Sequence, residues 1–238
     1  GGSAQDRGST SPGALSPGAL APGALSRAQG CLLGQLAGDA LGSLVEFKTP
    51  EEIRALYPGG VRDLADGGTW NTIAGQPTDD SEMALALART ILRSDGCDAA
   101  QALGAYKDWL ASKPFDVGVT IGGALRGHKN PGSQANGAMM RVSPLGIFAA
   151  RHPRSAAAEW ARADAELTHI NPVCLEANAL FTMAIAEAVA SGPAPQELWE
   201  MVDAWATELD VDAGLAAAVR ASRSGRPRDY RSQAGWVL

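Results

Sequence analysis

Aromatic residues, cysteines and basic charge are all scarce in this chain of 238 residues. Phe, Trp and Tyr make up 5% of the sequence, and runs of β-branched residues are nearly absent, whereas alanine is abundant. Alanine favours helices, while strands are enriched in β-branched and aromatic side chains. The composition therefore predicts an all-α fold of closely packed helices.

The chain offers little positive charge to a nucleic acid. It carries 20 Lys and Arg against 26 Asp and Glu, a formal net charge of -6, and the cations are scattered rather than clustered. Binding to a phosphate backbone requires a basic face, so we expect no nucleic-acid partner. No apolar run approaches the roughly 18 to 20 residues of a membrane helix, and the N-terminus lacks the pattern of a secretory signal. We therefore expect no membrane partner and a soluble, cytoplasmic protein.

The three cysteines, Cys31, Cys97 and Cys174, lie far apart in the sequence. No CxxC pair occurs, and no histidine stands at zinc-site spacing. This pattern supports neither a disulfide framework nor a thiolate metal site. We expect all three to be small buried apolar residues.

Residues 11–25 repeat a pentad three times, as SPGAL, SPGAL and APGAL. Pro followed by Gly every five residues opposes a continuous helix and favours successive turns or a flexible arm. We therefore expect a flexible Pro/Gly/Ala-rich extension over residues 1–26 and one helical domain over residues 27–238.

Apolar spacing and Gly/Pro punctuation predict a series of helices after the pentads. The first, over residues 27–44, carries small residues three or four apart, which predicts a central buried helix that other helices approach closely. The second begins at a capping box of Thr49 and Glu52, with Pro50 in its first turn, and Pro58 stops it. Further helices are expected over residues 79–93, 98–112, 118–127, 137–150, 153–167, 172–191, 195–209 and 211–223.

Thr78, Asp79 and Asp80 stand side by side where the third of these helices begins. Two interpretations fit this arrangement. Thr78 can cap the helix, with both carboxylates interacting favourably with the positive end of the helix dipole. Alternatively, the hydroxyl and the two carboxylates form part of an all-oxygen shell, which suits a hard cation such as Mg2+.

Two further carboxylates lie near helix ends. Glu46 stands between Val45 and Phe47, where a partly desolvated carboxylate suits proton transfer, although it could also be a helix-end glutamate in a salt bridge. Asp116 and Gly118 lie at a loop-to-helix junction, where Asp116 could be a simple cap.

Two loops could contact a ligand. Asn136-Gly137 predicts a turn, and the backbone amides of a helix start after it could bind an anion such as a phosphate. Thr168, His169 and Asn171 precede another helix, and a histidine there could be a surface residue, a cap or part of a site.

Taken in order, five motifs resemble those of the ADP-ribosylglycohydrolase family over residues 27–238. They are GDALGSLVEF, GQPTDDSEMALALA, PFDVG, NGAMMRVSPLGIF and THINPVC. The resemblance implies an all-α fold with a cleft floored by two Mg2+ ions. It also implies cleavage of the bond between the anomeric carbon of ADP-ribose and a protein side chain, and we expect that side chain to be arginine.

The resemblance also implies roles for individual residues. Thr78, Asp79 and Asp80 would be metal ligands. Glu46 would act near the scissile bond as a base or cleft gate, and Asp116 would contact the ribose or the attacking water. The ADP-ribose would be held by Gly118, Asn136, Gly137 and His169.

The sequence departs from the family at its end, because it stops at RSQAGWVL. Members continue to a Gly-Asp-x-Asp-Thr/Ser motif that supplies further metal ligands, whereas Asp210 and Asp212 here are better explained as a helix-helix loop. We therefore expect a missing C-terminal part, present as a companion fragment or removed by truncation. An alternative function is an ADP-ribose-binding or immunity-type protein that blocks an ADP-ribosylating toxin without catalysis.

Overall fold

The computed structural model describes residues 20–224 and 237 of the chain. Over these residues it is helical, and the only paired extended backbone among them is an isolated bridge between Gly67 and Thr72. The helices are α1 (Ala24–Gly42), α2 (Pro50–Leu56), α3 (Asp79–Ser94), α4 (Ala99–Ala111), α5 (Val119–Leu125), the 3-10 helix η1 (Asn136–Arg141), α6 (Ser143–Ala149), α7 (Arg154–Glu166), α8 (Pro172–Ala190), α9 (Pro195–Glu208) and α10 (Ala213–Ala221). The predicted all-α class is confirmed.

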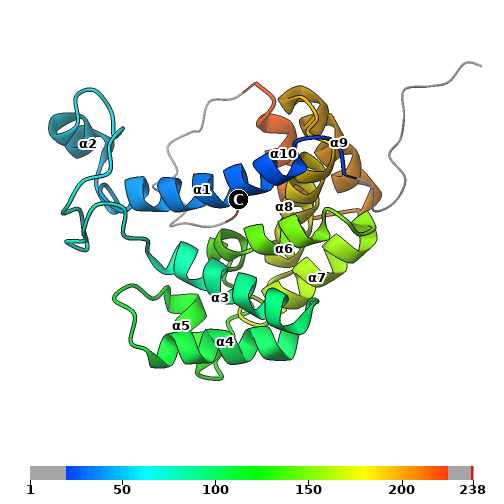
Figure 1. The fold of residues 1–238 in the computed structure, drawn as a ribbon, viewed down its shortest axis with the longest axis horizontal. Helices are drawn as coiled ribbons and strands as arrows, with labels where there is room; N and C mark the ends of the chain where they lie inside the picture. The colour runs from blue at the N-terminus through cyan, green and yellow to red at the C-terminus, as the bar shows by residue number, and fades with distance from the viewer. Residues whose placement is uncertain (1–19, 225–236, 238) are drawn as a thin grey trace, which may run out of the picture.

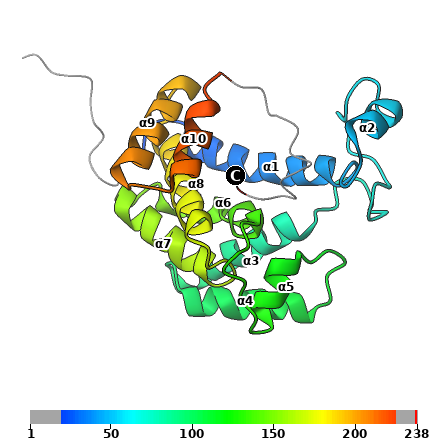
Figure 2. The ribbon, with the colours of Figure 1, turned by 180° about the vertical axis from the view of Figure 1, so that it is seen from behind.

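The helices form two packed groups that share α6 and α7 (Figures 1 and 2). One core is rich in alanine and is built from the five helices α6 through α10, with Leu180, Met183 and Trp205 among its buried side chains. The other lies between α3, α4 and α5 and buries Met83 and Tyr106 against residues of α6 and α7. The α2 helix stands apart from both groups, beyond the end of α1, in both views.

The α8 helix corrects the expectation that no segment suits a membrane span. This helix of 19 residues, Pro172–Ala190, has a mean hydropathy of 1.5, so by length and composition alone it is long and apolar enough to cross a membrane. Within this window, however, 61% of the residues are buried inside the protein. Because α8 packs against α6, α7 and α9, its all-round apolar character is that of a core helix.

Local signals predicted some helix ends well. Thr49 Oγ1 accepts a hydrogen bond from the Glu52 backbone N–H at 3.2 Å, and Glu52 Oε2 accepts one from the Thr49 N–H at 2.6 Å, which confirms the capping box. The single helix expected over residues 137–150 was wrong, because η1 and α6 are separate elements there. Pro144 in the first turn of α6 has no N–H to donate, so it suits a new helix start.

The α1 helix begins at Ala24, inside the third pentad and three residues before the predicted start at Arg27. Gly23 precedes it at φ 84°, a left-handed conformation that glycine adopts readily. The Arg27 side chain donates to the carbonyls of Val189 at 3.0 Å and Ala190 at 3.1 Å, which ties this start to the end of α8. The first pentads, in residues 11–19, lie outside the described residues.

The prediction that α1 is a central buried helix was wrong for the described part of the chain. Only Ala24 and Ala40 are buried in it, whereas Leu25 and Leu33 are 74% and 65% exposed. A Cβ added at Gly30, Gly34, Gly38 or Gly42 would meet nothing within 4 Å. Small residues allow a close approach, but among residues 20–224 and 237 no helix uses this face.

Candidate active site at the start of α3

The N-terminus of α3 is capped by a residue from another helix. Asp39 of α1 accepts hydrogen bonds from the backbone N–H groups of Thr78 and Ser81, each at 3.1 Å. The Thr78 hydroxyl also donates to the Asp39 carboxylate, at 2.8 Å, and makes no cap of its own. The local capping interpretation for Thr78 was therefore wrong, because Asp39 supplies the acceptor that a capping side chain would provide.

Asp79 and Asp80 occupy the first turn of α3, as predicted. Asp79 is buried, and its Oδ2 accepts a hydrogen bond from the Gly118 N–H at 3.3 Å. The backbone carbonyl of Asp80 accepts one at 3.3 Å from Gln35, which also donates to the Met140 carbonyl at 2.9 Å. Gln35 thus joins α1, α3 and η1 beside the two carboxylates.

Glu46 and Asp116 come to the same region from separate loops. Glu46 Oε2 accepts a hydrogen bond from Trp70 Nε1 at 2.7 Å, so its partner is an indole rather than the cation of a salt bridge. Asp116 does not cap α5, because Gly118 is the N-cap and no side chain bonds there. Instead, the Asp116 carboxyl lies beside that of Asp79.

Burial and neighbouring carboxylates raise the pKa values of Asp79, Asp80 and Asp116. Burial raises the pKa of Asp80 to about 7, together with repulsion from Asp79, Asp39, Glu46 and Asp116. Burial also raises the pKa of Asp116 to about 7, with Asp79 and Glu46 adding to the rise. Burial likewise raises the pKa of Asp79, although the Gly118 N–H opposes the change. Such a group of carboxylates can hold a proton near neutral pH or attract a cation.

The donor set, an all-oxygen group of carboxylates and one threonine hydroxyl, has the chemistry that Mg2+ prefers. Within the described ranges, however, no three His, Cys, Asp or Glu side chains are gathered closely enough to hold a metal ion as they stand. The Thr78 hydroxyl is also committed to Asp39. The chemistry therefore fits a hard divalent cation, while the metal-floored cleft remains a prediction.

Without divalent cations, the protein should lose stability as the pH rises from about 4 to about 7. The unfolded chain releases the protons of Asp80 and Asp116 near pH 4, whereas the folded chain keeps them until about pH 7, so ionisation favours unfolding across this window. We expect a loss of about 1–3 kcal/mol, since one pKa unit corresponds to about 1.4 kcal/mol and both groups keep some contact with solvent. Urea unfolding in EDTA at pH 5 and pH 8 measures it.

The variant Asp80→Asn provides the control for this pH dependence. It should reduce the difference in the free energy of unfolding between pH 5 and pH 8, because one of the two carboxyl groups with a raised pKa is gone. An unchanged pH slope in Asp80→Asn would contradict the assignment.

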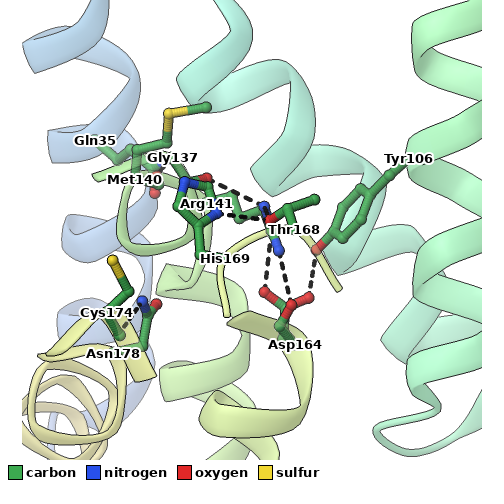
Figure 3. A network of polar contacts seen from close by, with 10 residues as sticks. All are labelled: Gln35, Tyr106, Gly137, Met140, Arg141, Asp164, Thr168, His169, Cys174 and Asn178. Atoms are coloured by element: carbon green, nitrogen blue, oxygen red, sulfur yellow. Dashed lines mark hydrogen bonds and ion pairs between the residues drawn. The ribbon is translucent and has the colours of Figure 1, made fainter. Parts of the chain in front are cut away.

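The Asn136-Gly137 segment lies at the start of η1, where Asn136 is exposed and Gly137 is buried. A Cβ at Gly137 would lie 2.7 Å from the Ile121 side chain and 3.0 Å from His169 Cε1, so only glycine fits this approach. His169 is fully buried behind Gly137 rather than on the surface (Figure 3). Asn171, not His169, caps α8, since its side chain accepts from the Val173 N–H at 3.0 Å.

A buried network fixes η1 and His169 (Figure 3). Arg141 is fully buried, and its guanidinium donates to the Asp164 carboxylate at 3.0 Å, the Gly137 carbonyl at 3.1 Å and the Thr168 hydroxyl at 2.9 Å. Tyr106 donates to the other Asp164 oxygen at 2.7 Å, and its ring lies 4.4 Å from the Arg141 guanidinium carbon. The buried network therefore fixes the position of the Gly137 carbonyl through a hydrogen bond from its interior side.

The same network assigns the tautomer of His169. The Thr168 hydroxyl accepts from Arg141 and lies 2.8 Å from His169 Nδ1, so its own proton is available for Nδ1. Burial, with a smaller contribution from the Arg141 charge, lowers the pKa of His169 to about 4, so the ring is neutral with its proton on Nε2. Nε2 is buried and has no hydrogen-bond partner in the described part of the chain.

Sequence reasoning missed several residues that build this region. Asp39 carried a signal, because a carboxylate in a helix of small apolar residues needs a partner. Trp70, Arg141 and Asp164 carried no local signal, since their partners are 24, 23 and 58 positions away along the chain. Asp212 caps α10 through the Gly214 N–H at 2.8 Å, which confirms the interpretation of Asp210 and Asp212 as a helix-helix loop.

Two small cavities lie away from the carboxylates. One, of about 30 Å³, is lined by Leu87, Cys97 and Trp160, and the other, of about 70 Å³, by Ala149, Arg154 and others. Pockets for small-molecule ligands usually measure about 300–1,000 Å³, so neither cavity is the predicted ADP-ribose cleft. All three cysteines are free, with Cys174 buried and the other two half-buried.

Comparisons with known proteins agree with this fold. Residues 20–238 match the ADP-ribosylglycohydrolase family. An ADP-ribosyl-[dinitrogen reductase] glycohydrolase of Rhodospirillum rubrum is 37% identical over 157 residues, which cover 62% of this chain and 52% of that protein. An ADP-ribosylarginine hydrolase of Pseudomonas putida is 32% identical over 160 residues, which cover 60% of this chain and 41% of that protein.

A solved structure shows the same fold. An ADP-ribosylglycohydrolase-related protein complex contains a chain that matches with a TM-score of 0.71 and 26% identity, covering 90% of this chain and 71% of that one. The chain spans about half the length of the curated relatives it matches. Because the family match covers all the described residues, the chain belongs to the ADP-ribosylglycohydrolase family.

Proposed function

We propose that this chain takes part in hydrolysing the bond between the anomeric carbon of ADP-ribose and an arginine side chain of a protein. The observation that carries the proposal is the gathering of Glu46, Asp79, Asp80 and Asp116 around the start of α3. Glycoside hydrolysis uses carboxylates that stabilise positive charge at the anomeric carbon and transfer protons. The names of the relatives support ADP-ribose as the sugar, and one of them supports arginine as the acceptor.

The proposal includes Mg2+, with two ions in a complete site. Thr78, Asp79 and Asp80 would hold magnesium, since their oxygens suit a hard cation and their mutual repulsion would fall when a cation binds. When bound, the ions would fix the ribose hydroxyls and increase the acidity of the attacking water. Asp39 would remain beneath them as the acceptor that orients Thr78.

Two carboxyl groups have proposed roles in proton transfer. Glu46 accepts the Trp70 hydrogen bond through one carboxylate oxygen. The other oxygen can take a proton from the attacking water while the water oxygen bonds to the anomeric carbon. Asp116, with a pKa of about 7, can keep a proton at neutral pH and donate it to the leaving nitrogen as the carbon–nitrogen bond breaks. Gly118, Asn136, Gly137 and His169 stay proposed contacts of the ADP-ribose, with His169 acting from behind Gly137.

The test is release of ADP-ribose from an ADP-ribosylated arginine peptide, followed by chromatography with and without Mg2+. We expect release that EDTA abolishes, and a fall of about 100-fold or more in kcat for Asp116→Asn, because general acid–base groups contribute roughly that much. Asp63→Asn, on the exposed loop after α2, is the control and should leave the rate unchanged. ADP-ribose binding without any hydrolysis would instead support the toxin-blocking alternative.

A further inference from the structure

Three aromatic rings form a rim directly beside the proposed catalytic carboxylates. The Trp70 ring lies between Phe47, at a centroid distance of 6.3 Å, and Phe115, at 5.8 Å. Phe47 follows Glu46 in the sequence and Phe115 precedes Asp116. The rim therefore connects the two loops that carry these carboxylates.

The turn that presents Trp70 is firmly built. Gly67 and Thr72 close it with two backbone hydrogen bonds, of 2.8 Å and 2.9 Å. Thr69 fastens it to the turn that follows α1, with its hydroxyl donating to the Glu46 carbonyl at 2.6 Å. Gly68 has φ 73°, and a Cβ there would lie 2.7 Å from Leu44 Cα, so the turn sits directly on the backbone after α1.

The three rings of the rim are at least partly exposed to solvent. Phe47 is 80% exposed and Phe115 is 40% exposed, while Trp70 is half-buried. Phe47 also has φ 62°, a left-handed conformation that a bulky residue adopts at a cost. Exposed aromatic faces beside carboxylates together suit a planar cation, because the rings attract positive charge and the carboxylates accept its N–H groups.

We infer that the rim of Phe47, Trp70 and Phe115 is the subsite for the guanidinium group of an ADP-ribosylated arginine. This inference rests on the proposed function and assigns the acceptor side of the substrate. Guanidinium fits better than ammonium because it is planar, weakly hydrated and stacks on aromatic faces. Trp70 has two roles in this subsite: its indole N–H donates to Glu46, and its ring packs against Phe47 and Phe115.

The adenine ring is the other planar group of such a substrate, and charge argues against placing it here. The rim adjoins the Glu46 carboxylate, which accepts a hydrogen bond from Trp70 Nε1 at 2.7 Å and repels the pyrophosphate that adenine must carry with it. The reacting bond also lies at the opposite end of ADP-ribose from the adenine. A rim that touches the loops of the proposed catalytic carboxylates is therefore placed for the leaving group.

Phe47→Gly and Phe115→Ala test the inference against Phe181→Ala, a matched control. Phe181 lies on α8 and is 42% exposed, close to the 40% of Phe115. Phe47→Gly should keep the fold, because glycine suits φ 62° and the lost ring is mostly in solvent. Using ADP-ribosyl-agmatine as the substrate, we expect each rim variant to raise KM about 3- to 30-fold, the range for cation–π contacts. The Kd for ADP-ribose should stay within about twofold, and Phe181→Ala should change neither value.

Each outcome separates the inference from the proposed function. If wild type cleaves ADP-ribosyl-agmatine and the rim variants keep its KM, the inference fails while the proposed function stands. If the rim variants weaken ADP-ribose binding equally, the rings hold adenine and the inference fails. If wild type cleaves nothing, the proposed function fails. Thermal shifts with ADP-ribosyl-agmatine in EDTA still test the rim in that case, and equal shifts in wild type and variants overturn it.

Discussion

Asp80→Asn is expected to lower ADP-ribose release by about a thousandfold or more and to stabilise the metal-free protein. A thousandfold corresponds to about 4 kcal/mol of transition-state stabilisation, which is within reach of a metal ligand or a charge at the reacting centre. Stability should rise by about 1–3 kcal/mol at pH 8, because the variant removes a carboxylate whose pKa burial and four neighbouring carboxylates raise to about 7.

The sign of the stability change decides what Asp80 is for. If the first-turn carboxylate only complemented the helix dipole, this substitution would lower the stability of the protein by about 0.3–1 kcal/mol. Asp108→Asn, on the exposed face of α4, serves as the control and should change neither property. Urea unfolding in EDTA and the release assay give both values. A less stable Asp80→Asn that kept its activity would show that the carboxylate is structural.

Asp164→Ala is expected to destabilise the protein by about 3–5 kcal/mol, because it leaves the fully buried Arg141 without its countercharge. For a chain of this size, the melting temperature should fall by roughly 6–20 °C. The carboxylate also opposes the effect of burial on Arg141, whose pKa burial lowers and Asp164 raises. Calorimetry at neutral pH measures the loss.

Tyr106→Phe is the matched control, since it removes one hydrogen bond to Asp164 and leaves the ion pair in place. It should cost about 1–2 kcal/mol. The double variant Arg141→Met, Asp164→Ala should lose less than the sum of the two single changes, because neither charge is then left alone. Equal losses for Asp164→Ala and Tyr106→Phe would contradict a dominant role for the ion pair.

The Arg141 network also connects stability to the site. Arg141 holds the Gly137 carbonyl and, through Thr168, the ring of His169. Loss of the network would free η1, so the substrate contacts proposed for Asn136 and Gly137 should weaken with it.

Properties that depend on a few neighbouring residues could be predicted from the sequence. The helical class follows from alanine content, and the start of α2 from a capping box closed within four residues. The placement of Asp79 and Asp80 in one helical turn needed only the helix start at Thr78. These features rest on backbone propensity and on hydrogen bonds between near neighbours.

Other features were decided only by the tertiary structure. Asp39 caps α3 from 39 positions away, and Trp70 bonds to Glu46 across 24 positions. The exposed face of α1 and the burial of His169 likewise depend on which helices lie beside them. The sequence by itself determined the helices and the carboxylates, while packing decided which partners each one meets, because hydrogen bonds between distant residues form only where the fold brings their atoms together.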